Sequence, residues 1–207
     1  MVSRFIVSLF AFAAGFLGTS VYLEANSFDT PRSSVHMVAA SDQSTGTMVV
    51  IAPGLALTAR HVAEHEDLAT TDGIPLKVVK MSDTADLALV SGNFGCPCTP
   101  LKEEPLSIDE KVVVIGYPLG AAQLATEGRI QDLVMNSIIS SAPVAPGNSG
   151  GGLFVWDGYQ WKLAGILIGI AAIPFNPWEP GPAGMVTHLN ISVSGLTIKE
   201  FLRDVPR

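Results

Sequence analysis

The chain has 207 residues, of which 48% are hydrophobic and 15% charged, a composition that can bury a core and that excludes a disordered protein. Its net charge of -7 excludes the basic surface that nucleic-acid binding requires, so no nucleic-acid partner is expected. The 20 glycines and 14 prolines indicate many turns, which favours short strands over long helices.

The first predicted element is a membrane-spanning helix over residues 5–23, a run without a formal charge. About 20 apolar residues cross a hydrocarbon layer of ~30 Å, whereas a cleavable signal peptide has a shorter apolar region and small residues at its cleavage site. The best cleavage site here, Leu23-Glu24-Ala25, begins with a large residue. We therefore predict that residues 1–26 hold an uncleaved anchor, with secretion after cleavage as the alternative.

Arg4, the only positive charge before this run, predicts on which side of the membrane the body lies. Positively charged flanks tend to stay in the cytoplasm. We therefore expect a single-pass protein anchored through residues 5–23, with residues 27–207 extracytoplasmic, either periplasmic or extracellular.

Short apolar runs separated by turn residues predict an all-β fold for the body. Residues 25–34 are polar and are interpreted as a linker, and residues 98–109 as a connector between two halves. The apolar residues of 193–202 recur at helical spacing, which predicts a short C-terminal helix packed on the body. The predicted strands are residues 35–40, 47–52, 55–58, 76–81, 87–91, 112–116, 138–141, 152–156 and 163–170.

Three local patterns supply side chains that can act together in nucleophilic chemistry. His61 ends an apolar strand, Asp86 opens another, and Ser149 lies in a glycine-rich turn. A serine hydroxyl is a weak nucleophile unless a histidine takes its proton and a carboxylate orients that histidine. Each pattern alone is more often a turn or a buried polar residue, but the three together favour Ser149 as nucleophile, His61 as base and Asp86 as acid. Asp83 is the competing acid.

The turn around Ser149 also offers backbone donors for the negative oxygen that forms when serine attacks a carbonyl group. Flanking glycines permit the backbone angles that aim two N–H groups at one point. We predict an oxyanion hole at Gly147, Asn148 and Ser149, with the amides of Gly147 and Ser149 as its donors.

The motifs Thr-Ala-Arg-His-Val (58–62), Asp-Leu-Ala (86–88) and Pro-Gly-Asn-Ser-Gly-Gly (146–151) resemble those of the trypsin-like serine peptidases, most closely the bacterial HtrA branch and viral relatives. The resemblance covers about residues 35–202. It implies a chymotrypsin-like fold of two antiparallel six-stranded β-barrels, over about 35–100 and about 110–190, with the site in the cleft between them. It also implies a serine endopeptidase that acts on protein or peptide substrates without a metal or cofactor.

The resemblance also implies where the substrate side chain before the cleaved bond is bound. The base of that pocket lies six residues before the serine, at Pro143. Its wall lies nineteen residues after the serine, at Ile168, and continues through Gly169 and Ile170. Because no carboxylate stands at the base, we expect small or medium apolar side chains to be preferred over lysine and arginine.

Two alternatives compete with this interpretation. His61, Glu64 and His65 form the pattern His-x-x-Glu-His, which on a helix would place both histidines on one face for zinc. No third ligand is fixed by spacing, so zinc catalysis is the weaker hypothesis. The other alternative is a membrane-anchored β-barrel that binds peptides without cleaving them, and the presence of all three triad residue types speaks against it.

Cys96 and Cys98 are the two cysteines of the chain. A disulfide between residues two apart closes a small ring, so two free thiols are the expected outcome. A disulfide, metal binding and pairing with another molecule remain alternatives.

Overall fold

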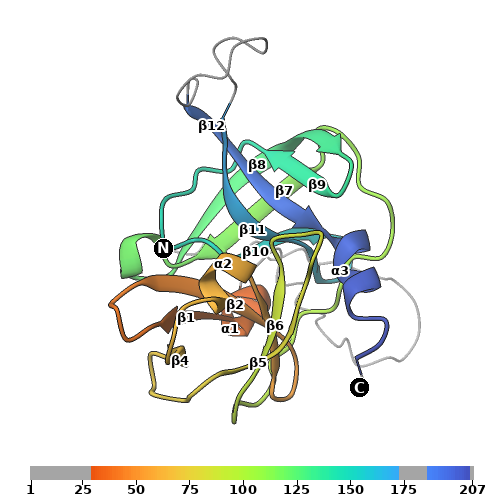
Figure 1. Ribbon diagram of the computed structural model, residues 1–207. Coiled ribbons are helices and arrows are strands. Elements are labelled where there is room, and N and C mark those ends of the chain that lie inside the picture. Colours follow the sequence, from red (N-terminus) through yellow and green to blue (C-terminus); the bar gives the residue numbers. More distant parts are fainter. Residues whose placement is uncertain (1–28, 173–185, 206–207) are drawn as a thin grey trace, which may run out of the picture.

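The computed structural model describes residues 29–172 and 186–205, which form two β-structured units stacked on each other (Figure 1). The predicted membrane-spanning segment, residues 5–23, lies outside the described residues. Among the residues that are described, no helix is both long and apolar enough to cross a membrane.

The first unit is a six-stranded antiparallel sheet. Its strands are β1 (Val35–Ala39), β2 (Thr45–Ala52), β3 (Leu55–Thr58), β4 (Ala69–Thr70), β5 (Lys77–Met81) and β6 (Ala88–Ser91). They follow the spatial order β4-β1-β2-β3-β6-β5. The five strands predicted for this half are confirmed to within two residues, and the two-residue β4 is an addition.

The second unit is a closed six-stranded antiparallel barrel with the order β10-β11-β12-β9-β8-β7. Its strands are β7 (Lys111–Gly116), β8 (Leu124–Val134), β9 (Ser137–Ser140), β10 (Gly152–Trp156), β11 (Trp161–Ala172) and β12 (Val186–Ser194). The sequence predicted neither β8 nor β12. Ile130 is the only buried residue in the eleven positions of β8, and no apolar run marks that strand. In β12 the polar residues Asn190 and Ser192 are buried, so this strand has no apolar run either. The fold is therefore all-β with two six-stranded units, as expected.

Strands buried on both faces join the two units through a shared core. In β2, Met48 and Val50 face the interior of the first sheet, whereas Val49 points to the other side. In β7, Val114 faces the barrel interior, and Ile115 joins Val49 in the cluster between the units. The alternation follows from the two-residue period of a strand, and it explains why residues 48–51 and 112–115 are unbroken apolar runs.

Two short helices flank the β units. The prediction of a linker over 25–34 is wrong for residues 29–34, which form α1 (Asp29–Ser34). A proline in the first turn is compatible with a helix, and the hydroxyl of Ser34 donates to the Pro31 carbonyl oxygen. The predicted C-terminal helix is confirmed as α3 (Gly195–Phe201), where the Thr197 amide donates to the N-cap hydroxyl of Ser194 at 3.3 Å.

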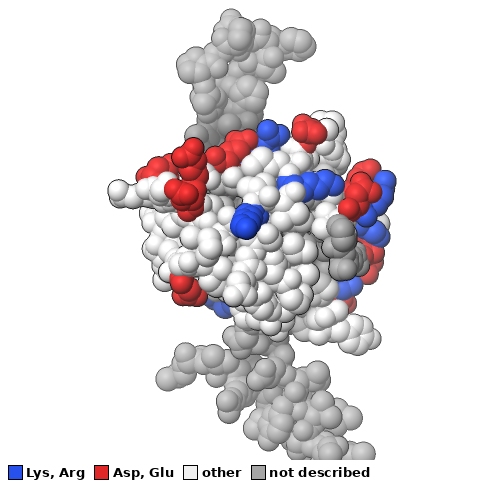
Figure 2. Space-filling model, turned by 60° about the horizontal axis from the view of Figure 1, so that its bottom comes forward, with Lys and Arg blue, Asp and Glu red and all other residues white. Residues whose placement is uncertain are grey.

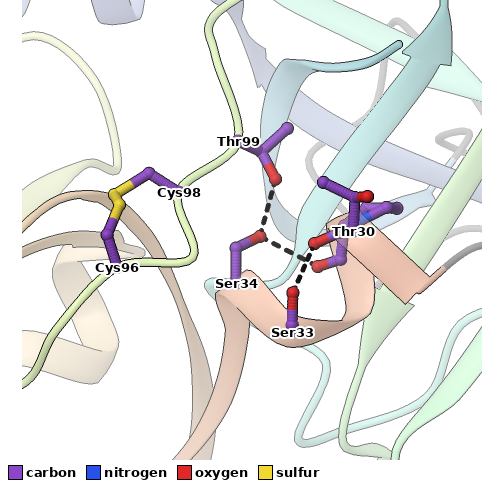
Figure 3. Close-up of a disulfide and its surroundings, with 7 residues drawn as sticks. Thr30, Ser33, Ser34, Cys96, Cys98 and Thr99 are labelled. Carbon is purple, nitrogen blue, oxygen red and sulfur yellow. Dashed lines mark hydrogen bonds between the residues drawn. A yellow bond between two sulfur atoms is a disulfide. The ribbon is translucent and has the colours of Figure 1, made fainter.

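Cys96 and Cys98, where the chain enters the connector between the units, are bonded to each other (Figure 3). The expectation of two free thiols is therefore wrong. Next to them Thr99 is 1% exposed, and its hydroxyl lies 2.8 Å from that of Ser34 on α1. This hydrogen bond therefore packs the start of the connector against α1.

Charged side chains of both signs are spread over the surface. Figure 2 shows acidic and basic groups close together around the edge of a face whose middle is mostly uncharged. Some charges are paired, as where the Lys162 ammonium lies 3.1 Å from carboxylate oxygens of both Glu104 and Asp157. No broad basic area is visible on this face, in agreement with the negative net charge.

Candidate active site

His61 is placed by a short helix that follows β3. The buried strand ends at Thr58, and α2 (Arg60–Ala63) begins after Ala59, whose extended backbone makes the turn. Val62 and Ala63 are buried against the first sheet, which leaves His61 on the outer side of the helix with 45% of its side chain exposed. In Figure 1, α2 lies where the two β units meet.

Asp86 binds His61 through both carboxylate oxygens. One oxygen accepts the backbone amide of His61 at 3.0 Å, and the other lies 2.7 Å from ring atom Nδ1. Asp86 stands just before β6, which pairs with β3, so the sheet register brings the two residues together. The competing acid, Asp83, is exposed and takes no part in this contact.

The contact shifts the pKa values of both partners. Burial acts to raise the pKa of the Asp86 carboxyl, but hydrogen bonds from the ring and backbone of His61 outweigh burial and hold the pKa below 3.8. The hydrogen bond to Asp86 raises the pKa of His61 above 6.5, against the opposing effect of partial burial. An ionised carboxylate only accepts, so Nδ1 carries the shared hydrogen and Nε2 remains available as a base.

The residues of the His-x-x-Glu-His pattern have separate partners. The Glu64 carboxylate accepts a hydrogen bond from the Arg60 guanidinium at 2.8 Å, and His65 Nδ1 lies 3.0 Å from an Asp42 carboxylate oxygen. The helix ends at Ala63, so it does not continue far enough to hold both histidines on one face. Within residues 29–172 and 186–205, no three potential metal ligands are grouped.

Ser149 lies in the turn between β9 and β10, on the opposite unit from His61. Gly147 and Gly150 have φ values of 91° and 84°, in the left-handed region that favours glycine. Ser149 and His61 line the same pocket of about 60 Å³, together with residues at the start of β2. The structure brings the two side chains to one pocket without a hydrogen bond between them; such bonds often tighten only when substrate binds.

Backbone amides beside Ser149 are free to bind a ligand. Within the described residues, the amides of Gly147 and Ser149 have no acceptor. The amide of Asn148, by contrast, donates to the Ala145 carbonyl oxygen at 3.1 Å. Of the three residues predicted for the oxyanion hole, Gly147 and Ser149 thus offer donors, while Asn148 contributes the shape of the turn.

The residues predicted to bind the substrate side chain lie on two segments of the barrel. Pro143 is exposed, and its carbonyl oxygen accepts a hydrogen bond from the Thr126 hydroxyl at 2.8 Å. On β11, Ile168 is half-buried, Gly169 faces open space, and Ile170 is 40% exposed. None of these four side chains carries a charge.

The sequence did not indicate the start of β2 and the residue before it as part of the site. Ser44, Thr45 and Gly46 line the pocket with Ser149 and His61. A Cβ atom at Gly46 would come within 2.7 Å of Val62, so the close approach of the start of β2 to α2 requires glycine. Small polar residues around a glycine are common in any hairpin, so no signal in the sequence could have singled them out.

Solved protease structures share the fold. The Rv3671c protease of M. tuberculosis in its inactive form matches with a TM-score of 0.70 at 21% identity, covering 87% of this chain and 92% of that one; its active form also gives 0.70. A serine endoprotease from Yersinia pestis gives 0.66 at 22% identity, over 87% of this chain and 68% of that one. The HtrA-type protease AlgW with a tripeptide matches with a TM-score of 0.66 at 23% identity, covering 86% of this chain and 62% of that one.

At these identities the structural likeness shows the fold alone. Among curated proteins, none matches the chain. The model of the trypsin-like peptidase domain, however, matches residues 45–166, more than half of the chain. That match spans His61, Asp86 and Ser149, and it agrees with the HtrA-type structural neighbours, so the chain belongs to the family of trypsin-like peptidase domains.

Proposed function

We propose that the protein is a serine endopeptidase in which Ser149 is the nucleophile, His61 the base and Asp86 the orienting acid. The observation that carries the proposal is the double attachment of His61 to Asp86, beside a pocket that His61 shares with Ser149. A carboxylate that fixes the tautomer of a histidine next to a serine is the arrangement that activates a hydroxyl for attack.

The reaction follows from these positions. The Ser149 hydroxyl oxygen bonds to the carbonyl carbon of the substrate while His61 Nε2 takes the hydroxyl proton. The carbonyl oxygen becomes negative and accepts hydrogen bonds from the amides of Gly147 and Ser149. His61 then gives its proton to the leaving amine, the peptide C–N bond breaks, and an acyl-enzyme remains. Water repeats the sequence in place of serine and releases the acid.

The substrate preference proposed here is for small or medium apolar side chains before the cleaved bond. It is supported by the uncharged residues of the predicted pocket, where Pro143 would stand at the base and Ile168 along the wall. A lysine or arginine side chain would find no counter-ion among Pro143, Ile168, Gly169 and Ile170. An aliphatic side chain would gain about 25 cal/mol for each Å² of apolar surface that it buries.

A fluorophosphonate probe tests the proposed nucleophile in the full chain, purified in mild detergent. We expect one equivalent of label on wild type, located on Ser149 by mass spectrometry, and none on Ser149→Ala. His61→Ala should label at a rate lower by at least about three orders of magnitude. Peptide binding without any labelling of wild type would favour a non-catalytic peptide-binding barrel instead.

We also propose that residues 5–23 anchor the protein in a membrane with the peptidase domain on the extracytoplasmic side. The uncharged length of this segment supports the anchor, and Arg4 supports the orientation. The full chain should stay in the membrane pellet after carbonate extraction. A soluble form whose N-terminal sequence begins at or after residue 24 would show that the segment is a cleaved signal.

A further inference from the structure

We propose that Thr47 is a positioning residue for the reaction at Ser149: from the first sheet, it holds the peptide groups that flank the two oxyanion amides. This inference rests on the proposed function and names a residue that the three-residue triad does not include. Thr47 lies in β2 and is fully buried, at 0% exposure.

Thr47 contacts the nucleophile turn through its backbone and through its side chain. Its amide donates to the Ser149 carbonyl oxygen at 2.8 Å, and its hydroxyl donates to the Gly147 carbonyl oxygen at 2.8 Å. The same hydroxyl oxygen accepts the Tyr117 amide at 3.2 Å. Its carbonyl oxygen in turn accepts the Thr58 hydroxyl at 2.7 Å, which ties the contact to β3. A single residue of one unit thus holds two carbonyl groups of the other.

The two carbonyl groups belong to peptide groups that are also held at their amide ends. Beyond Gly147, the Asn148 amide donates to the Ala145 carbonyl oxygen at 3.1 Å. Beyond Ser149, the Gly150 amide donates to the Leu167 carbonyl oxygen at 2.7 Å. A peptide group is planar, so fixing both of its ends fixes its orientation.

The peptide groups that carry the oxyanion amides are held at their carbonyl ends. The Pro146 carbonyl oxygen accepts the Leu119 amide at 2.6 Å, and the Asn148 carbonyl oxygen accepts the Gly151 amide at 2.8 Å. In a trans peptide the N–H points opposite to the C=O, so the amides of Gly147 and Ser149 are directed away from these partners. Among the amides of residues 147–151, these two remain for substrate.

The Thr47 hydroxyl also stabilises the segment that holds Pro146. It accepts a hydrogen bond from the Tyr117 amide. Two residues further on, Leu119 has a left-handed φ of 57°, and its amide donates to the Pro146 carbonyl oxygen. Removing the hydroxyl would leave both the Gly147 carbonyl and the Tyr117 amide without this partner. The Gly147 carbonyl belongs to the same residue as the Gly147 amide, and Tyr117 lies in the segment that holds the Pro146 carbonyl. The direction of the Gly147 amide would therefore be less well fixed, and stabilisation of the oxyanion would fall.

A purely structural role for Thr47 predicts a different result, and Thr99 provides the matched control. Thr99 is also a buried threonine. It lies in the connector, outside the site, and its hydroxyl is 2.8 Å from the hydroxyl of Ser34 on α1 (Figure 3). Thr47→Val and Thr99→Val each keep the branched shape of the side chain and remove a buried hydroxyl. Both should lower the melting temperature, but only Thr47→Val should slow the chemistry.

The test is the inactivation of the full chain by the fluorophosphonate, with the maximal rate and the half-saturating concentration measured separately. In Thr47→Val we expect the maximal rate to fall about tenfold to hundredfold, which is at most the effect of losing an oxyanion donor. The half-saturating concentration should change by less than about threefold. Thr47→Ser, which keeps the hydroxyl, should restore the rate to within about threefold of wild type. Thr99→Val should react like wild type.

Two results would overturn the proposal: a folded Thr47→Val that reacts at the wild-type rate, or a Thr99→Val that slows as much. If Thr47→Val does not fold, Thr47→Cys replaces it, because its thiol is a weaker donor in the same place. Thr47→Cys must then react more slowly than Thr47→Ser. Failure of wild type itself to react would instead refute the proposed function, and this inference with it.

Discussion

The Asp86 carboxylate binds both the backbone amide and ring atom Nδ1 of His61, at 3.0 and 2.7 Å. The bond to the amide fixes where the carboxylate stands relative to α2, and the bond to the ring fixes the rotation and the tautomer of the imidazole. Nε2, the ring nitrogen that accepts the serine proton in the proposed reaction, is therefore left unprotonated when His61 is neutral.

Replacing Asp86 by asparagine should remove this control of the tautomer. The amide group can present its NH2 to Nδ1, which would place the ring hydrogen on Nε2 and block the base. We expect Asp86→Asn to lower kcat by about four orders of magnitude. Asp83→Asn is the matched control three residues away, and its kcat should equal that of wild type. Equal losses in both variants would contradict the assignment of Asp86.

The pH dependence of activity should reflect the raised pKa of His61. Only neutral His61 can act as base, and the hydrogen bond to Asp86 holds its pKa above 6.5. The acid limb of kcat/KM should therefore have its midpoint above 6.5. In a variant without the carboxylate, such as Asp86→Ala, partial burial remains and lowers the pKa, so any residual activity should have its midpoint at lower pH. A wild-type midpoint below 6.5 would contradict this.

The same pair should make the free energy of unfolding depend on pH. The raised pKa of His61 contributes stability that is fully present below 6.5 and is lost as pH rises through the folded-state pKa. The lowered pKa of Asp86 contributes stability above 3.8 that is lost as pH falls through its folded-state pKa. In urea unfolding, the difference between wild type and His61→Ala should thus be larger near pH 5 than near pH 8. An unchanged or reversed difference would show that the pair does not contribute.

The proposed triad could be inferred from sequence because each member stands in a local pattern that also determines its element. His61 follows a buried strand, Asp86 precedes one, and Ser149 lies in a turn whose glycines the backbone requires. Thr47 could not be found in this way. Its contact with Gly147 joins residues 100 positions apart, and a threonine in a strand is unremarkable until the two units are packed together.

Two of the elements that the sequence missed, β8 and α1, are ones in which burial leaves little trace. Strand β8 has one buried position, so its register depends on its neighbours β7 and β9 and not on its own apolar pattern. Helix α1 is a polar hexamer, fixed by hydroxyl-to-carbonyl hydrogen bonds and by the contact of Ser34 with Thr99. Both depend on tertiary contacts that no local pattern encodes.

Two glycines with a left-handed φ allow the effect of backbone strain on stability to be measured apart from the effect of steric overlap. Gly150 and Gly73 have φ values of 84° and 78°, so an alanine is strained to a similar degree at both. A Cβ atom at Gly150 would also overlap the Thr47 carbonyl oxygen and the Thr58 hydroxyl, whereas one at Gly73 would meet nothing within 4 Å.

We therefore expect Gly73→Ala to reduce the free energy of unfolding by about 1–2 kcal/mol. Gly150→Ala should cost more than about 4 kcal/mol or prevent folding, because the backbone atoms it would meet cannot move aside cheaply. Urea unfolding of both variants measures the difference. Equal losses would mean that the nucleophile turn is not packed against β2 as closely as the structure has it.

The base of the predicted substrate pocket can be tested by adding the charge that it lacks. Wild type should cleave peptides after valine, leucine or alanine faster than after arginine. Pro143 is exposed and its bond to Thr126 is made by its carbonyl oxygen, so its side chain can change without removing that bond. Pro143→Asp should raise kcat/KM for arginine peptides about tenfold to hundredfold, the range of a hydrogen bond to a charged group. Pro143→Asn, which has the same shape without the charge, should give no such gain; a wild-type preference for arginine would refute the assigned pocket.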